Sequence, residues 1–253
     1  FKFLSFGWTG AHEQWRHYTR GYLFFAALAT PLVISVHSVV SWDFALGIVP
    51  GWHTTIFAPY FVAGAIHSGL AMVLTLMIPL RKLFKYEDII TIEVLQNVAK
   101  TIVLTGLIVG LAYGTEYFIA WYSHNSIEME QFRWRALGDY RWGFFFMVLC
   151  NTLVPLLFLF RKVRTTIVSL FIISLIVNFG MWWERFVIIA GGVAHGFAPH
   201  AWGLYAPTMI EYGIMLGAFC LFFFLFVLFA KHLPSVSMTE MKETIAEGAG
   251  HAT

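Results

Sequence analysis

The stretch TTIVSLFIISLIVNFGMWWERFVIIA, residues 165–190, is long and apolar enough to cross a membrane, yet it contains the adjacent charges Glu184 and Arg185. About 20 helical residues span the ~30 Å hydrocarbon core of a bilayer. A charge at the bilayer centre costs ~2.5–3.5 kcal/mol on insertion scales. The pair therefore indicates either a functional site or an ion pair that only fastens this helix to its neighbours.

The composition of the whole chain agrees with a membrane protein. Hydrophobic residues make up 59% of the chain and charged residues 12%, and the mean hydropathy is +0.73. A net charge of +2 gives no indication of a nucleic-acid partner. The only cysteines, Cys150 and Cys220, form no CxxC or CxxCH motif. We therefore expect no metal, cluster or covalent haem to be held by this chain.

Six apolar segments have the length of membrane-spanning helices. This predicts an all-α, polytopic transmembrane bundle in which residues 1–253 form a single membrane domain. We place the spans at about residues 22–42, 54–79, 101–122, 142–160, 165–190 and 209–230.

Basic residues at the ends of these segments predict the topology. Eleven of the sixteen Lys and Arg residues fall on one side of the predicted membrane. Only Arg133, Arg135 and Arg141 fall on the other. Cytoplasmic loops carry the excess of Lys and Arg, so both chain ends are expected in the cytoplasm.

The connecting segments carry further expectations. Tyr86–Asn97 mixes acidic and aliphatic residues at helical spacing, which predicts a short amphipathic helix along the inner membrane face. Gly191–Pro207 is rich in Gly and Pro, which favours an outer loop that caps a site. The polar segment after Lys231 is expected to contact a partner or to be mobile. Because Phe1 is not Met and no signal-peptide pattern precedes the first span, the chain is expected to be truncated.

Ionisable side chains gather in the outer half of the predicted bundle. At ~1.5 Å per residue, Asp43 lies near the outer end of its span, and Glu116 and Glu184 lie within their spans towards the same side. Ser174, Asn178 and Arg185 share one helix face. With His67 and Asn151 at mid-depth, these groups predict a hydrated path that leads protons to the outer carboxylates. Equally, such Ser, Thr and Asn side chains often only hydrogen-bond a neighbouring helix.

The histidines do not favour a metal centre. A bis-histidine haem needs two His residues at matched depth, whereas His37 lies near an outer end and His67 nearer the middle. His-rich boxes of the membrane di-iron type are also missing. Asp and His side chains near the outer surface, among many aromatic residues, favour a site for a quinone head group.

Three motifs resemble a known family: HSVVSWDFA (37–45), PGWHTTIFAPYFVAGAIHSG (50–69) and WWERF (182–186). They resemble the polysulfide-reductase or NrfD-type membrane subunits, and most of all the quinol-oxidising ActC subunits of bacterial alternative complex III. Those subunits have about ten helices, so this chain resembles their second part.

The resemblance implies that menaquinol or ubiquinol is oxidised near the outer face. The partners that it implies are a periplasmic iron–sulfur subunit, a multihaem cytochrome c subunit and a homologous NrfD-type membrane subunit. It implies a catalytic role for Asp43 and, more weakly, for His37, with Trp42 as a further quinol-binding residue. Glu184 and Arg185 match a pair in a transmembrane proton route. To these, their predicted depth adds Glu116, His67 and Asn178.

Two other functions stay open on the sequence. One is a paralogous scaffold or proton-conducting subunit of the same complex that has lost its quinol site, although the retention of Asp43 argues against it. The other is a secondary transporter, which the lack of repeated Gly- and Pro-interrupted helices disfavours.

Overall fold

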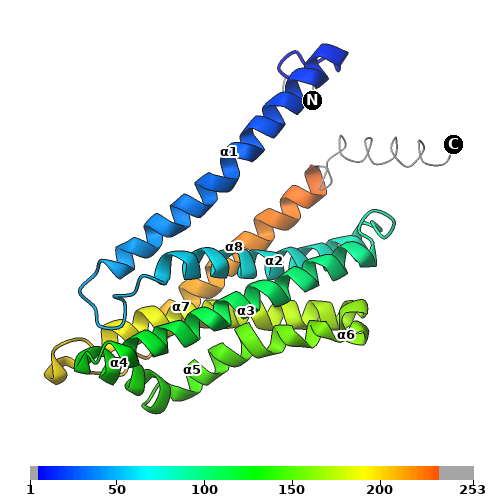
Figure 1. The fold of residues 1–253 in the computed structure, drawn as a ribbon. Coiled ribbons are helices and arrows are strands. Elements are labelled where there is room, and N and C mark those ends of the chain that lie inside the picture. The colour runs from blue at the N-terminus through cyan, green and yellow to red at the C-terminus, as the bar shows by residue number, and fades with distance from the viewer. Residues whose placement is uncertain (1–4, 234–253) are drawn as a thin grey trace. The chain divides into compact units, whose positions relative to one another are not determined.

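The computed structural model describes residues 5–233, and within this range all regular secondary structure is helical (Figure 1). Six segments are long and apolar enough to cross a membrane, which confirms the predicted fold class. They are α1 (His12–Ala45), α2 (Phe57–Leu83), α3 (Ile92–Tyr122), the fourth segment Arg141–Leu159, α7 (Ile167–Ala194) and α8 (Met209–His232). The chain is thus a multi-pass membrane protein.

Shorter elements connect these spans and interrupt one of them. The fourth span begins as α5 (Arg141–Val148), continues as the π-helical turn η1 (Leu149–Leu153) and ends as the 3₁₀ segment η2 (Val154–Leu159). The extramembrane helix α4 (Ser126–Leu137) connects α3 to α5. The elements α6 (Arg161–Thr165) and η3 (Pro199–Ala201) each cover a single turn.

The prediction of an amphipathic helix on the membrane surface at Tyr86–Asn97 is wrong. In the structure residues 86–91 form a turn, and residues 92–97 are the first residues of α3. The guanidinium Nε of Arg81 on α2 donates a hydrogen bond to the Ile90 carbonyl in this turn at 2.7 Å. Thr91 then caps α3 by accepting a hydrogen bond from the Val94 amide. Ile90 and Leu95 are buried in the core. The apolar residues of this segment therefore pack into the bundle at the end where α2 runs into α3. We call this end the inner end and the opposite end, at α4, the outer end, after the topology predicted from the sequence.

The predicted outer loop also begins later than expected, because α7 continues through Gly191 and Gly192 to Ala194. Both glycines are buried, and the Trp52 indole packs directly on the Cα of Gly192. Its Nε1–H donates to the Ile188 carbonyl at 3.0 Å. Glycine here allows a close approach between a loop and a helix, so these two residues do not end the helix.

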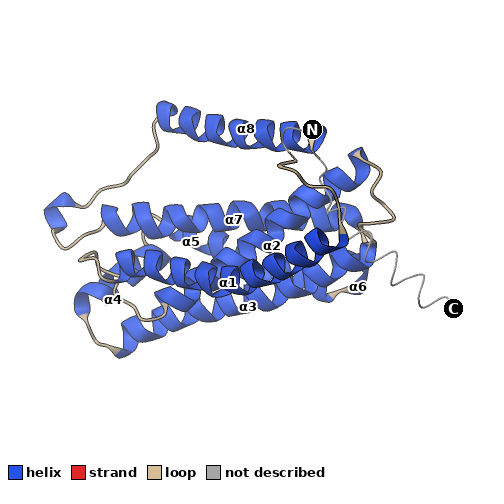
Figure 2. Ribbon diagram, turned by 90° about the horizontal axis from the view of Figure 1, so that it is seen from above, coloured by secondary structure: helices blue, strands red, loops and turns tan. Residues whose placement is uncertain are grey.

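The helical core consists of α2, α3, the fourth span and α7, which lie side by side (Figure 2). Their buried side chains form two clusters, one towards each end of the bundle. The inner cluster centres on Leu74, Leu95, Ile102, Phe158 and Leu170. The outer cluster is more aromatic and includes Trp52, Phe57, Tyr60, Phe61 and Tyr113. Of the candidate functional residues, His67, Glu116, Asn178, Glu184 and Arg185 lie on these core helices, whereas His37, Trp42 and Asp43 lie on α1.

Helix α1 buries less of its surface than α2, α3, the fourth span and α7 do. It contacts α2 near its outer end, and its N-terminal half diverges from the bundle (Figure 1). Ser41 is its buried residue, whereas many large apolar side chains such as Phe24 and Leu32 are exposed. Most of the surface of α1 thus faces lipid or another protein.

Residues 205–253 form a separate unit, which contains α8. Thr208 caps this helix: its hydroxyl accepts from the Glu211 amide, and the Glu211 carboxylate accepts from the Thr208 amide at 2.6 Å. The predicted sixth span is confirmed. The predicted partner-contacting or mobile tail lies largely outside the described residues.

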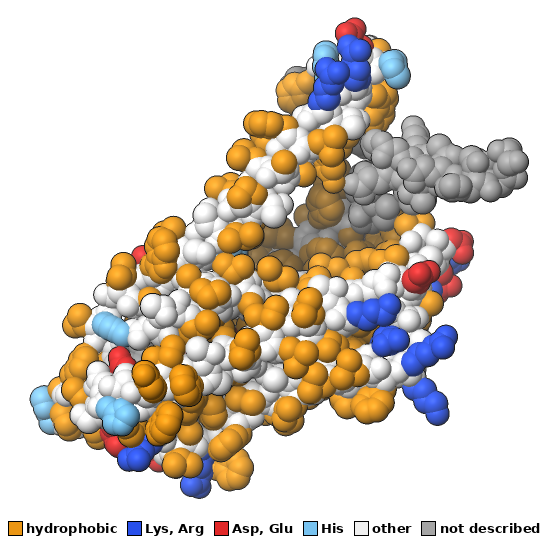
Figure 3. Space-filling view, viewed as in Figure 1, with side chains coloured by type: hydrophobic (Ala, Val, Ile, Leu, Met, Phe, Trp, Pro, Cys, Tyr) orange, Lys and Arg blue, Asp and Glu red, His pale blue; other side chains and the backbone are white. Residues whose placement is uncertain are grey.

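The surface of the bundle has the polarity of a membrane protein. Hydrophobic side chains cover the flanks of the helices, and Lys and Arg side chains gather where α2 runs into α3 (Figure 3). This end contains Arg81, Lys82 and Lys85. The pattern agrees with the basic side that the sequence predicts to be cytoplasmic.

Candidate functional site

The carboxylate of Glu184 is completely buried and is held by side chains from two other helices. The hydroxyl of Tyr113 on α3 donates a hydrogen bond to its Oε2. Asn151, in the π-helical turn, donates from Nδ2 to the same Oε2 at 3.2 Å and to the Tyr113 hydroxyl at 2.9 Å. Three spans thus converge on one carboxylate oxygen.

The fourth span changes its helical winding at the point where it approaches Glu184. The five-residue π turn contains Asn151, and Pro155 follows in the 3₁₀ segment, where it has no N–H to donate to the preceding turn. Single π turns are frequent at functional sites, because they redirect side chains without ending a helix. Gly180 on α7 makes room for this turn, since a Cβ there would collide with Asn151 and Cys150.

Arg185 is the nearest countercharge of Glu184. Its Nη2 lies 3.3 Å from Glu184 Oε1, and its guanidinium Cζ lies 4.2 Å from the centre of the Phe61 ring. The side chain of Arg185 is 31% exposed while that of Glu184 is 0% exposed. Gly64 leaves space for the guanidinium, because a Cβ there would lie 3.2 Å from Nη2. The pair is therefore buried on its acidic side and accessible on its basic side.

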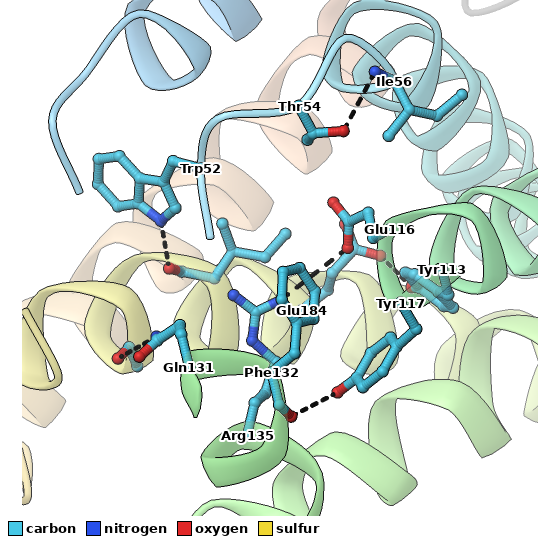
Figure 4. A network of polar contacts seen from close by, with 12 residues as sticks. Trp52, Thr54, Ile56, Tyr113, Glu116, Tyr117, Gln131, Phe132, Arg135 and Glu184 are labelled. Carbon is cyan, nitrogen blue, oxygen red and sulfur yellow. Dashed lines mark hydrogen bonds and ion pairs between the residues drawn. The ribbon is translucent and has the colours of Figure 1, made fainter. Parts of the chain in front are cut away.

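A second buried pair lies further towards the outer end. Glu116 on α3 and Arg135 on α4 approach to 3.9 Å between Oε2 and Nη1, and both side chains are about 95% buried, with 4% and 5% exposed. Figure 4 shows Arg135 reaching from α4 towards Glu116, with Tyr117 and Phe132 beside it. The Arg135 guanidinium also lies over the Phe132 ring at 4.9 Å. Two carboxylates, each with its own arginine, therefore occupy the outer half of the bundle.

The inner half contains neutral polar side chains. Asn178 on α7 donates to the Thr75 hydroxyl at 2.9 Å, and that hydroxyl lies 3.0 Å from the Ser174 hydroxyl. At mid-depth, His67 Nδ1 lies 2.8 Å from the Thr105 hydroxyl, and His67 is fully buried. The residues of the expected proton path thus form separate clusters. Asn178 donates a hydrogen bond to Thr75 of α2, whereas Arg185, on the same face of α7, forms an ion pair with Glu184.

The residues expected to bind quinol lie apart from these clusters. Asp43 and Trp42 are exposed on α1, and His37 is partly exposed. The Nδ1–H of His37 donates to the Val33 carbonyl at 2.8 Å, which leaves Nε2 as its hydrogen-bond acceptor. At 100° per residue, Asp43 lies on the opposite face of α1 from Ile34 and from the direction of the buried Ser41.

An apolar recess of about 470 Å³ lies between α1 and α2. Ile34 and Ser38 of α1 line it, and Thr105 of α3 forms part of its wall. The volume is within the range of small-molecule pockets. Ser38 of its lining is the chain neighbour of His37, and Thr105 of its wall is the residue whose hydroxyl contacts His67.

The outer end of the bundle is covered by aromatic stacking around His195. The His195 ring stacks between the rings of Trp134 and Trp202 at centroid separations of 4.4 and 3.7 Å. Burial lowers the pKa of the His195 imidazole. A cleft of about 230 Å³ lies beside it, lined by Pro50, Glu130 and Phe197 among others. Residues 195–204, which follow α7, thus contribute to the cover of this end of the bundle.

Several of these side chains were not predicted from the sequence. Tyr113 lies three residues before Glu116 and therefore on nearly the same helix face, but an aromatic residue in a span gave no separate signal. In the sequence, Arg135 is recognisable only as a basic residue of a predicted outer loop. Its burial depends on α4 folding back onto the bundle, which local sequence does not reveal.

The described part of the chain, residues 5–233, contains no group of three or more His, Cys, Asp or Glu side chains that could hold a metal ion. Both carboxylates of the site are paired with arginines, and that of Glu184 also accepts hydrogen bonds from a hydroxyl and an amide group. Their arrangement suits the binding and release of protons.

Comparison with known families gives a match over most of the chain. The model of the family described as polysulphide reductase, NrfD matches residues 2–196, which contain α1 to α7. Comparison with curated proteins gives no significant match.

Proposed function

On the premise that this chain belongs to the NrfD polysulphide reductase family, we propose that it is the quinol-binding membrane subunit of an electron-transfer complex. Family members are membrane subunits of quinone-linked redox complexes and partner with iron–sulfur subunits. The finer proposal is that quinol is oxidised near the outer face of a bacterial inner membrane. Its electrons pass to an external iron–sulfur subunit and then to a multihaem cytochrome c.

The family match over α1 to α7 is the observation that carries this proposal. The apolar recess beside α1 supports a quinol site near this helix, since it can take the apolar tail beside Ile34 and Ser38. Oxidation of one quinol releases two electrons and two protons. The electrons leave through the partner, and the protons need acceptors on this chain.

Asp43 and His37 are the proposed proton acceptors. His37 Nε2 is free to accept a hydrogen bond from a quinol hydroxyl, because Nδ1 is occupied by the Val33 carbonyl. The Asp43 carboxylate is exposed and can pass a proton to water. Trp42 is proposed to pack against the quinol ring. A general base must lie within hydrogen-bond reach of the proton that it accepts. Because Asp43 lies on the face of α1 opposite Ile34, a neighbouring helix or subunit has to hold the quinol head group outside the recess for Asp43 to act on it.

We further propose that the buried polar groups conduct protons. Thr75, Ser174 and Asn178 offer hydroxyl and amide groups in the inner half. Glu184, with Tyr113 and Asn151, can hold a proton in the outer half. Asn178 and Glu184 are six residues apart on α7, about 9 Å along its axis, so water would have to complete the path between them.

The test is the quinol:cytochrome c reductase activity of the intact complex that carries Asp43→Asn, with its haem and iron–sulfur contents measured to verify assembly. Lost turnover with full cofactor content supports a quinol site whose proton chemistry uses Asp43. Unchanged turnover moves the quinol pocket to another subunit.

One observation favours a second candidate function. The Glu184 cluster is completed within this chain, whereas Asp43 is exposed and contributes to none of the pockets described above. A buried proton site together with an unused Asp43 is what a scaffold or proton-conducting paralogue without a quinol site would present. In that case Asp43→Asn leaves turnover intact and Glu184→Gln still reduces proton release.

A further inference from the structure

The junction of α3 and α4 contains buried polar atoms that have no protein hydrogen-bond partner. They are Oε1 of Glu116, Nε and Nη2 of Arg135, and Oε1 of Gln131. Each residue is at least 95% buried. Leaving such groups unpaired costs free energy, and in proteins ordered water commonly satisfies them.

The Glu116–Arg135 pair is too long for a direct hydrogen bond. Its 3.9 Å separation exceeds the 2.7–3.2 Å usual for an N–H···O contact. A separation of this size is commonly bridged by water. Arg135 is therefore attracted to Glu116 by its charge without being held by a direct hydrogen bond.

The same junction lies next to the cleft at the outer end. Gly51 packs against Gln131 and Arg135, since a Cβ there would lie 3.1 Å from Gln131 Cγ and 3.6 Å from Arg135 Nη2. Its neighbour Pro50 lines the cleft, together with Glu130 and His195. Arg135 thus lies between the buried carboxylate of Glu116 and the side of the bundle where Pro50 lines this cleft.

We propose that Arg135 is the gate of a hydrated proton exit, which connects Glu116 to the outer cleft at Glu130 and His195. This inference rests on the proposed proton conduction. When Arg135 lies against Glu116, its charge favours the ionised carboxylate and hinders a cation from passing. When a proton reaches Glu116 from the Glu184 cluster, the attraction is lost and Arg135 moves aside. The proton then leaves through water, and the pair re-forms. Arg135 is a positioning residue that acts through Glu116.

The experiment uses the intact complex in sealed vesicles and measures quinol-driven proton release together with electron transfer to cytochrome c. In Arg135→Met we expect proton release to slow by about tenfold or more, with the KM for quinol unchanged. Arg135→Lys restores part of the rate, because it keeps the charge. The matched control is Arg133→Met, on the same helix but exposed, and it behaves as wild type.

An infrared difference spectrum tests the gate independently of folding losses. We expect a protonated-carboxyl band that is absent in Glu116→Gln and that persists for longer in Arg135→Met than in wild type. The double variant Glu116→Gln/Arg135→Met should be no slower than the slower single variant, because both residues act in one step.

The outcomes separate this inference from the function on which it rests. Wild-type proton release in Arg135→Met, or equal defects in Arg135→Met and Arg133→Met, overturns the gate alone. A wild-type complex that oxidises quinol without releasing protons through this chain, as shown by unchanged release in Glu184→Gln, overturns the proposed conduction and the gate together.

Discussion

The surroundings of Glu184 and Asp43 show two ways in which this chain presents a carboxylate. Glu184 is 0% exposed, and its partners Tyr113, Asn151 and Arg185 all belong to this chain. Asp43 is exposed at the outer end of the helix that is least integrated in the bundle. A buried charge must be paired by its own fold, whereas an exposed one is available to a ligand or another subunit. We therefore expect mutations at the two sites to separate proton conduction from quinol oxidation.

The largest effect is expected for Glu184→Gln. The amide keeps the shape of the side chain but cannot carry a proton through the cluster, so quinol-driven proton release should fall by about a hundredfold. The measurement is proton release and electron transfer by the intact complex in vesicles. Glu93→Gln, at an exposed position on α3, is the control and should have no effect. Equal rates for the two variants would remove Glu184 from the proton route.

The next effect concerns the packing that brings Asn151 to Glu184. Gly180→Ala places a methyl group against Asn151 and Cys150 and should destabilise the protein by ~1–3 kcal/mol. Gly69→Ala is the matched control, because no atom lies within 4 Å of its added Cβ. Thermal unfolding of the purified complex compares the two. If both melt alike, the fourth span does not depend on this close contact.

A smaller effect is expected for Tyr113→Phe, which removes one donor to Glu184 and leaves that of Asn151. Proton release should slow by about tenfold while the complex assembles normally. Tyr122→Phe, at an exposed tyrosine on the same helix, serves as the control. A wild-type rate in Tyr113→Phe would assign the proton transfer to Glu184 without help from this hydroxyl.

The smallest effect is the stability change of Asp43→Asn. Because Asp43 is exposed, its substitution should change the free energy of unfolding by less than ~0.5 kcal/mol. Thermal unfolding in parallel with the turnover assay checks this. A marked loss of stability would mean that Asp43 is packed against a neighbour, and lost turnover could then no longer be assigned to proton chemistry.

The spans could be predicted almost completely from the sequence, whereas the site could be predicted only in part. Glu184 and Arg185 stood out because a charge within an apolar span is costly. The α4 helix, Arg135 and the π turn at Asn151 were not predicted, because their positions depend on contacts between segments distant in the chain. The amphipathic helix predicted at Tyr86–Asn97 was wrong because Ile90 and Leu95 pack into the core.

By itself the sequence determined that the chain is an all-helical membrane protein with six spans, because a bilayer requires every spanning segment to be long, apolar and internally hydrogen-bonded. It also determined that Glu184 and Arg185 lie inside the membrane region. Only the tertiary structure decided which side chains meet there. Tyr113 and Asn151 meet Glu184 because helices distant in sequence pack together, and Gly180 permits their close approach. Arg135 meets Glu116 because α4 folds back onto the end of α3, where Gly51 leaves room for its side chain.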